Sequence, residues 1–561
     1  MWNLITMPQK TTKIFLVFLA AIFVLNLLQS ANTELLLDEA YYWFYAQDLA
    51  WGYFDHPPMV AWMIHLGSAI FPAELGVRLI SCIMYTINIA LLWTLIDHPR
   101  KERYILLFCV LVLSPTLFHA YGFLTLPDTA LLFFTTLFLL VYKRFLTKTS
   151  LWNTALLGIL MAAMMYSKYH GLLVILFVLF SNFGLVRNKY AWLSASIALV
   201  CYIPHLLWLM DHHFISLQYH LSDRPFSPYS FTDFTLGYFL NLLALFGLIF
   251  PLVYFSLVRT RITGKFSTAL VYIVYGFILF FFVSSFSRRV QTQWLIVISI
   301  PLIIITFNYM VDHPKIRLWI LRLGLPNIAI LLFLRIWLIN GSVLPISFET
   351  HFNRTWVNIL KDEVGDMPVV FENSYGNAAT YTFYSGNKAY SLNNAHYRLN
   401  QYSIDDSEED VQHKRILYVS RYLREGDLEF IGAKGKEYKG KYMDDFESFR
   451  KLYCMVADNP VSVKDSTALI LKVYNPYPVD IALKKLKFGA TFLNPYKRVT
   501  EIAKITPMPL DTNLQQLNSK DTTLFKVQLP SPTVDGAAYI RFGISENGLP
   551  YGYNSKNIKL N

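Results

Sequence analysis

Residues 38–58 read DEAYYWFYAQDLAWGYFDHPP and come soon after an apolar run at residues 12–30. The stretch carries four acidic residues, and the loop that contains it, from residue 31 to 75, has no lysine or arginine. Because residues 38–51 are rich in aromatic side chains, we expect them to form an amphipathic helix in the headgroup plane of a membrane. Asp38 is suited to cap the N-terminus of that helix. An acidic, aromatic loop next to an apolar run indicates a membrane protein with polar chemistry at the membrane surface.

The apolar residues are concentrated before residue 340. The chain has 561 residues, is 54% hydrophobic and has a mean hydropathy of +0.37. About eleven segments approach the roughly 20 apolar residues that a bilayer span needs. These are residues 12–30, 76–96, 104–121, 127–142, 152–167, 171–186, 191–210, 236–257, 267–284, 292–310 and 317–339. The sequence therefore predicts an all-α polytopic membrane domain of about eleven transmembrane helices.

The lysines and arginines of the loops predict the orientation. If the N-terminus with Lys10 and Lys13 is cytoplasmic, sixteen of these cations fall on the cytoplasmic side. The opposite loops hold four, at Lys168, Arg224, Arg288 and Arg289. The positive-inside rule then places the loop at 31–75 outside the cytoplasm. Because the net charge of +11 follows from this topology, it does not indicate a nucleic-acid partner.

The first apolar span is long enough to be either a membrane helix or part of a signal peptide. The first span could be a signal peptide cleaved near Ser30-Ala31, but no A-x-A site is present, and we expect the span to be retained.

The four cysteines have no CxxC spacing, and three of them lie in apolar runs. Neither a disulfide framework nor a thiolate zinc site is therefore expected.

The chain becomes polar after Asn340. Short β-like runs at 368–371, 415–419 and 468–473 are separated by turns that contain Asn, Gly and Pro. We predict three domains: a transmembrane domain at 1–340, an extracytoplasmic α/β domain at 341–475 and a β-rich tail at 476–561.

Asp38 and Glu39 are the first candidates for catalysis. Carboxylates at a membrane surface can serve as a general base or as cation ligands. The alternative is a helix cap with solvated acids; we favour catalysis for these two residues and the solvated role for Asp48. Asp128, in Thr125-Leu-Pro-Asp128, suits both a helix start and a second acidic site position.

Asp38-Glu39, the aromatic segment and Tyr53-Phe-Asp-His-Pro-Pro58 together resemble the superfamily of protein O-mannosyltransferases and lipid A aminoarabinose transferases. They also resemble bacterial transferases that add galacturonic acid to lipopolysaccharide. The resemblance covers residues 12–340 and implies the C-type glycosyltransferase fold with a polyprenyl-phosphate sugar donor. It implies that Asp38 is the catalytic base, that Glu39 accompanies it and that Asp128 is the second acidic position.

The resemblance also suggests substrate-binding residues. Asp55-His56 stands where the aminoarabinose enzymes have an acidic-Lys-Pro-Pro element, and a neutral imidazole contacts phosphate less well than lysine does. Lys168-Tyr-His170-Gly resembles their Lys-Gly element. Arg288 and Arg289 resemble a loop of bacterial members and suit bidentate phosphate binding. Aqueous loop charge is the alternative for these cations.

Metal dependence varies in the superfamily, so a divalent cation between Asp38 and Asp128 is left open, and no metal ligands are assigned. Asp211-His212-His213 suggests a metal site, but adjacent histidines on a helix do not easily share one ion. Asn373–Asn377 and Leu392–Tyr402 resemble segments of the family's periplasmic domain whose role is unknown, and we expect them to position the acceptor.

We predict an enzyme of a bacterial inner membrane, with its site and C-terminal domain periplasmic. It transfers a sugar from a polyprenyl-phosphate carrier in the membrane lipid to an acceptor hydroxyl on lipid A, lipopolysaccharide, another glycan or a protein. The alternative is a transporter or flippase of a lipid-linked saccharide, for which internal repeats and polar residues near mid-membrane are expected.

Overall fold

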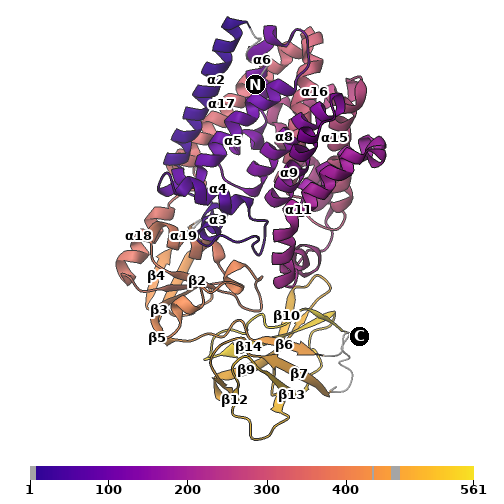
Figure 1. Cartoon of the computed structure of the whole chain (residues 1–561). Coiled ribbons are helices and arrows are strands. Elements are labelled where there is room, and N and C mark those ends of the chain that lie inside the picture. The colour runs from indigo at the N-terminus through magenta and orange to yellow at the C-terminus, as the bar shows by residue number, and fades with distance from the viewer. Residues whose placement is uncertain (1–7, 433–434, 457–467, 561) are drawn as a thin grey trace. The chain divides into compact units, whose positions relative to one another are not determined.

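The computed structural model describes residues 8–432, 435–456 and 468–560. Its contacts divide the chain into two compact units. The first, here called the helical unit, has residues 1–213 and 229–351, and the second, the soluble unit, has residues 214–228 and 352–561. Figure 1 shows helices in the first and mainly strands in the second.

The helical unit is built from long apolar helices joined by short turns. Its main helices are α2 (Gln9–Asn32), α3 (Leu37–Gln47), α4 (Met59–Ser68), α5 (Ala73–Leu95), α6 (Ile105–Leu113), α7 (Thr116–Ala120), α8 (Pro127–Thr147), α9 (Leu151–Ser167), α10 (Gly171–Ser181), α11 (Lys189–Asp211), α13 (Gly237–Phe246), α14 (Phe250–Arg259), α15 (Gly264–Ser284), α16 (Ser299–Asp312) and α17 (Pro314–Ile339). Eight segments of the described chain are long and apolar enough to cross a membrane. The multi-pass membrane architecture is thus confirmed, whereas the count of eleven spans is not.

The count differs because several predicted spans are short or broken. The segment predicted at 104–121 is divided into α6 and α7 at Ser114-Pro115, since proline cannot donate a helical backbone hydrogen bond. The segments predicted at 152–167 and 171–186 are helices of 17 and 11 residues.

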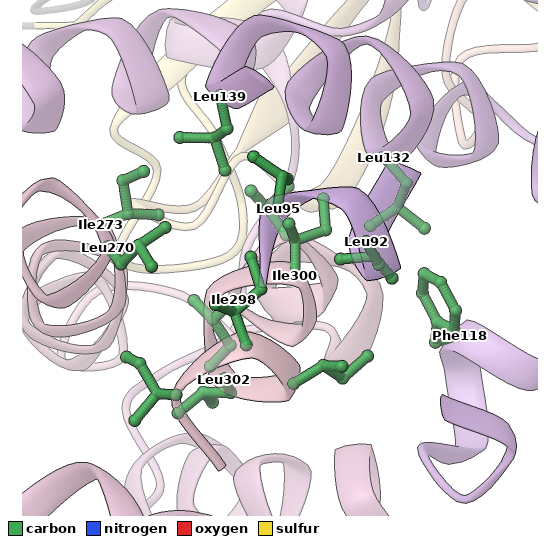
Figure 2. Close-up of a cluster of buried hydrophobic side chains, with 14 of the residues drawn as sticks. Leu92, Leu95, Phe118, Leu132, Leu139, Leu270, Ile273, Ile298, Ile300 and Leu302 are labelled. Carbon is green, nitrogen blue, oxygen red and sulfur yellow. The ribbon is translucent and has the colours of Figure 1, made fainter. Parts of the chain in front are cut away.

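The core of the helical unit surrounds α16 and the turn η6 (Thr292–Ile298) that leads into it. Figure 2 shows leucine and isoleucine side chains of α5, α8, α15 and α16 meeting there, with Phe118 of α7. Leu92, Leu139, Ile298 and Ile300 are fully buried. A helix that is apolar on all sides belongs in such an interior.

The outer helices expose large apolar side chains. Leu28 of α2 is 59% exposed, Val200 of α11 63% and Ile336 of α17 58%. Apolar surface of this extent on long helices is unfavourable in water and suits contact with lipid.

The soluble unit begins with an α/β layer. Its helices are α18 (Asn353–Val364) and α19 (Tyr375–Ser385), and its strands are β1 (Val369–Glu372), β2 (Ala389–Leu392), β3 (Lys414–Ser420), β4 (Leu428–Ile431) and β5 (Glu437–Phe446). The sheet has the order β2-β1-β3-β5-β4, in which β1 pairs in parallel with β2 and β3. Helix α19 makes the crossover between the parallel strands β1 and β2.

A β-rich layer follows, with two four-stranded sheets. Its strands are β6 (Tyr453–Val456), β7 (Ala468–Tyr474), β8 (Ile481–Ala482), β9 (Leu486–Leu493), β10 (Val499–Ile505), β11 (Met508–Pro509), β12 (Gln516–Leu517), β13 (Thr522–Gln528), β14 (Tyr539–Glu546) and β15 (Ile558–Lys559). The sheets have the orders β10-β9-β14-β15 and β11-β13-β7-β6. Alternate residues of both sheets, such as Leu471, Phe488 and Phe542, form one core.

The boundary predicted at residue 475 is too late. Strands β6 and β7 pair with each other, and β7 pairs with β13, far along the chain. They therefore belong to the β-rich layer, and the change of sheet occurs between Phe446 and Tyr453. Local β-propensity identifies the strand at 468–474 but does not reveal its partner.

Candidate functional site

The first turn of α3 is fixed through Glu39, which is fully buried. Arg78 of α5 donates from Nε to Glu39 Oε1 at 2.9 Å and from Nη2 to Oε2 at 2.5 Å. The backbone N–H groups of Leu36 and Thr125 donate to the same carboxylate, at 3.1 and 2.8 Å. Arg78 also donates to the carbonyls of Ser30, Thr33 and Glu34 at the end of α2. Glu39 thus ties together α2, α3, α5 and the loop before α8.

Asp38 lies beside Glu39 but in a different environment. Its side chain is exposed, in the first turn of α3, where the helix dipole favours a negative charge. The N-cap is Leu36, so the expectation that Asp38 caps the helix is wrong. The hydroxyl of Tyr121 interacts electrostatically with both Asp38 and Asp128. Both predicted acidic positions therefore lie within electrostatic range of one phenol.

Asp128 lies in the first turn of α8, with Pro127 at the helix start. Lys168, which follows the last residue of α9, donates from Nζ to both carboxylate oxygens at 2.8 Å. The two side chains are 5% and 8% exposed, so the pair is buried. The structure thus brings together Asp128 and Lys168, which are 40 residues apart in the sequence.

The aromatic segment packs one side of α3 against the rest of the protein. Tyr45 is buried and stacks on Tyr53, with ring centroids 4.3 Å apart, and the Tyr53 hydroxyl donates to the Tyr45 carbonyl at 3.0 Å. Burial, together with the neighbouring Tyr41 and Asp55, raises the pKa of Tyr45. Asp55 is 5% exposed, and the half-buried His56 packs edge-on against Tyr42 at 5.5 Å.

A histidine of α11 holds the tip of the same loop. The fully buried His205 contacts the Trp51 carbonyl through Nδ1 at 2.7 Å and the Tyr169 hydroxyl through Nε2 at 3.2 Å. If Nδ1 donates to the carbonyl, Nε2 accepts from Tyr169. Tyr169 follows Lys168, so this chain of contacts links the aromatic loop to the turn that carries Lys168.

The other predicted binding residues lie in the turns around α10 and α15. His170 is half-buried and packs against Phe281 and Trp294, at 5.4 and 5.9 Å between ring centroids. Arg288 and Arg289 are exposed in the turn between α15 and η6.

The residues at the site do not fit a divalent cation well. Both oxygens of Asp128 contact the Lys168 ammonium, and a cation between Asp38 and Asp128 would have to displace it. Among the described residues there is no cluster of three or more His, Cys, Asp or Glu side chains that could hold a metal ion.

Two important residues were not among the sequence candidates. Arg78 lies in a predicted span, and a charged residue at such a position is a signal of function or of a buried partner. Tyr121 has no comparable signal, because only the fold brings it near Asp38 and Asp128.

The comparisons with known proteins concern the family and the fold. The family model of dolichyl-phosphate-mannose-protein mannosyltransferases matches residues 55–208, a range that includes Asp128 and Lys168. The lipid A galacturonosyltransferase RgtD of Rhizobium johnstonii is 23% identical over 245 residues, which are 40% of this chain and 48% of RgtD. The lipopolysaccharide core galacturonosyltransferase RgtA of the same organism is 28% identical over 220 residues, 36% of this chain and 43% of RgtA. The chain thus matches less than half the length of each of these curated relatives.

Among solved structures, ArnT from Cupriavidus metallidurans in the apo state has a TM-score of 0.55 and 14% identity. The match covers 77% of this chain and 98% of that one. The form of ArnT bound to undecaprenyl phosphate has a TM-score of 0.54, with the same coverage. The similarity to ArnT confirms the predicted fold class, and the sequence matches to the mannosyltransferase family model and to RgtD and RgtA support the resemblance to the C-type glycosyltransferase superfamily.

Proposed function

We propose that this protein transfers a sugar from a polyprenyl-phosphate carrier to an acceptor hydroxyl, with Asp38 as the general base. The observation that carries the proposal is the environment of Asp38, an exposed carboxylate on a helix turn whose neighbour Glu39 is held by Arg78. A base must be both accessible and fixed in position. Asp38 meets both conditions.

The reaction is a single displacement. The acceptor oxygen attacks the anomeric carbon of the sugar, and the bond from that carbon to the phosphate oxygen breaks. Polyprenyl phosphate leaves with the electron pair, and the acceptor proton passes to the Asp38 carboxylate. One displacement inverts the anomeric configuration, so a product with retained configuration would contradict this role of Asp38.

Cations near the site would stabilise the leaving phosphate. We assign this role to Lys168, supported by its position beside Asp128, and to the exposed Arg288 and Arg289. In this assignment Asp128 holds the Lys168 ammonium in place when the carrier is absent. When the carrier binds, its phosphate competes with Asp128 for that ammonium. Asp55, His56 and His170 are proposed to contact substrate around this centre.

The site would face the periplasm of a bacterial inner membrane. The asymmetry of sixteen against four loop cations supports this orientation. The names of the relatives, which act on lipid A and on the lipopolysaccharide core, make an envelope glycolipid the first acceptor to test. No step of the proposed reaction requires a metal, and we expect a chelator to leave transfer unchanged.

The test replaces Asp38 by an isosteric amide. We expect Asp38→Asn to lower transfer by about 10²- to 10⁴-fold, the usual contribution of a general base, without loss of the folded protein. Asp48→Asn is the matched control, because Asp48 is also exposed and terminates the same helix. Transfer is measured by mass spectrometry of envelope glycolipids and glycoproteins from a strain that lacks the protein and is complemented with each variant.

Equal loss in both variants, or no loss in Asp38→Asn, would contradict the assignment. A transporter of lipid-linked saccharide would tolerate Asp38→Asn, so the same comparison separates these two functions.

A further inference from the structure

The soluble unit contains a cavity of about 220 Å³. It lies between the loops that follow β2 and β5, the segment before β15, and residues 215–218 of the same unit. Drug-sized ligands occupy pockets of about 300 to 1,000 Å³. A cavity smaller than these suits one small ring compound and does not suit a lipid chain.

Arg450 is a buried charged residue of the cavity lining. Its side chain is 6% exposed, and its Nε lies 3.0 Å from an oxygen of the fully buried Glu546. Apart from this ion pair, the guanidinium makes no hydrogen bond with any described residue, so Nη1 and Nη2 have no hydrogen-bond acceptor. A guanidinium carries five N–H donors, and buried donors without partners are unfavourable. An oxygen-rich ligand in the cavity would satisfy them.

The loop around Arg450 is held in advance of any ligand. Glu408 accepts from the backbone N–H of Arg450 at 2.9 Å, from the Ser448 hydroxyl at 2.7 Å and from the Tyr477 hydroxyl at 2.5 Å. A Cβ at Gly552 would lie 2.7 Å from Nη1 of Arg450, so the guanidinium occupies space that only a glycine leaves free.

The rest of the wall combines rings with positive charge. Tyr390, Tyr453 and Tyr553 line the cavity, and Arg541 stacks on the Tyr553 ring with its guanidinium carbon 3.6 Å from the centroid. The charged residues among the described lining are Arg450, Lys451 and Lys556, all cationic. Lys451 also pairs with Asp406 at 3.1 Å, whereas Lys556 is exposed.

We propose that this cavity binds a single sugar unit that carries an anionic group, either a carboxylate or a phosphate. Arg450 contacts the anion, in the planar geometry that guanidinium groups offer to carboxylate and phosphate, and the tyrosine rings pack against the sugar. Lys556 adds charge at the edge. The cavity belongs to the soluble unit, whereas Asp38 belongs to the helical unit, and occupancy of the cavity involves no transfer reaction.

The test measures binding of free monosaccharides to the full chain in detergent micelles by saturation-transfer NMR. The probes are galacturonic acid, glucose 6-phosphate and the neutral sugar galactose. We expect at least one anionic sugar to bind tenfold or more tightly than galactose, and the comparison of the two anionic probes identifies the preferred group. Galactose binding as tightly as both anionic sugars would overturn the proposal.

Three variants locate the bound sugar. We expect Arg450→Lys to weaken binding of the preferred anionic sugar by tenfold or more, and Lys556→Gln to weaken it by two- to fivefold. Lys487→Gln, at an exposed lysine of β9 outside the cavity lining, is the control for the change of charge and should leave binding unchanged. Because Lys556 is exposed, its variant remains informative if Arg450→Lys fails to fold.

Arg289→Gln separates this site from the proposed carrier site. If Arg289→Gln abolishes binding of the anionic sugars and Lys556→Gln does not, they bind to the helical unit and the proposal is wrong. If the cavity variants weaken binding while Asp38→Asn retains full transfer, the cavity proposal stands and the proposed reaction fails.

Discussion

Asp38 and Glu39 are neighbours in the chain with opposite environments. Glu39 accepts four hydrogen bonds, two of them from Arg78, and Asp38 is exposed. Removal of one partner of a buried ion pair costs about 3–5 kcal/mol, because the other charge is left uncompensated. We therefore interpret Glu39 as a positioning residue that keeps the turn of Asp38 rigid. The sequence shows two acids in a row and cannot distinguish these roles.

Glu546 makes the stability of the soluble unit depend on pH. Burial raises the pKa of this carboxyl to about 7, although Arg450 lowers it and lies 3.0 Å away. A carboxyl with a raised pKa in the folded state stabilises the fold fully at pH values below its unfolded value, near 4.5, and that stabilisation is lost as pH rises through 7. We expect the melting temperature to fall between pH 4.5 and 7, with a loss on the order of 3 kcal/mol.

Thermal melts of the full chain in detergent, followed by circular dichroism, check this prediction. Glu546→Gln, which resembles the protonated form, should flatten the dependence in this window. Glu437→Gln, at an exposed carboxylate of β5, should behave like the unsubstituted chain. An identical pH profile for Glu546→Gln and the unsubstituted chain would show that another group is responsible.

At the scale of single residues, the sequence predicted which residues lie in the outward loops, but it did not predict which partner each side chain has. The outward loops contained both Asp128 and Lys168 as candidates, and the fold joins them in a pair. The sequence does not identify Arg78 as a site residue, because Arg78 lies within an apolar run and its partner Glu39 is 39 residues away. Contacts over such distances depend on helix packing, which one sequence does not specify.

Among the helices, α9 packs closely against α11 at Gly158. A Cβ there would lie 2.5 Å from the carbonyl oxygen of Ser194 and 2.9 Å from Ile197, and the Ser194 hydroxyl donates to the Thr154 carbonyl at 2.9 Å. Small residues permit such approach between membrane helices. We expect Gly158→Ala to destabilise the helical unit by about 1–3 kcal/mol, the usual cost of overpacking.

The melting temperature in detergent measures this effect, and Gly237→Ala is the matched control. A Cβ at Gly237 would meet its nearest neighbour at 3.5 Å, which is ordinary contact. Equal stability of both variants would mean that α9 and α11 are less closely packed than described.

At the scale of elements, hydropathy located the apolar segments but only one of two interruptions. The break at Ser114-Pro115 divides one predicted span, and Lys168–His170 separates α9 from α10. Averaging over about 20 residues conceals the first break, whereas the second, which contains the lysine of the candidate site, agrees with the predicted division into residues 152–167 and 171–186.

For the whole molecule, the orientation in the membrane is the property to test. Leu49 is 46% exposed just after α3, and Lys148 is exposed at the end of α8. We expect a membrane-impermeant maleimide to label Leu49→Cys in intact spheroplasts and Lys148→Cys only after lysis, because the loop cations are asymmetric.

The unsubstituted chain supplies the background, since Cys82, Cys109 and Cys454 are buried and Cys201 is half-buried. The reverse pattern of labelling would place Asp38 on the cytoplasmic side and remove the basis for periplasmic transfer.

The division of the chain into units has a consequence for the exchange of parts between related proteins. Residues 214–228 belong to the soluble unit, where the Phe226 N–H donates to the Tyr496 carbonyl at 3.2 Å, yet they are encoded between α11 and α13. Exchange of the residues after 351 alone would therefore not transfer the complete soluble unit, because residues 214–228 would remain with the helices. A functional chimera has to replace residues 214–228 and 352–561 together, and recombination at a single crossover would separate surfaces that pack together.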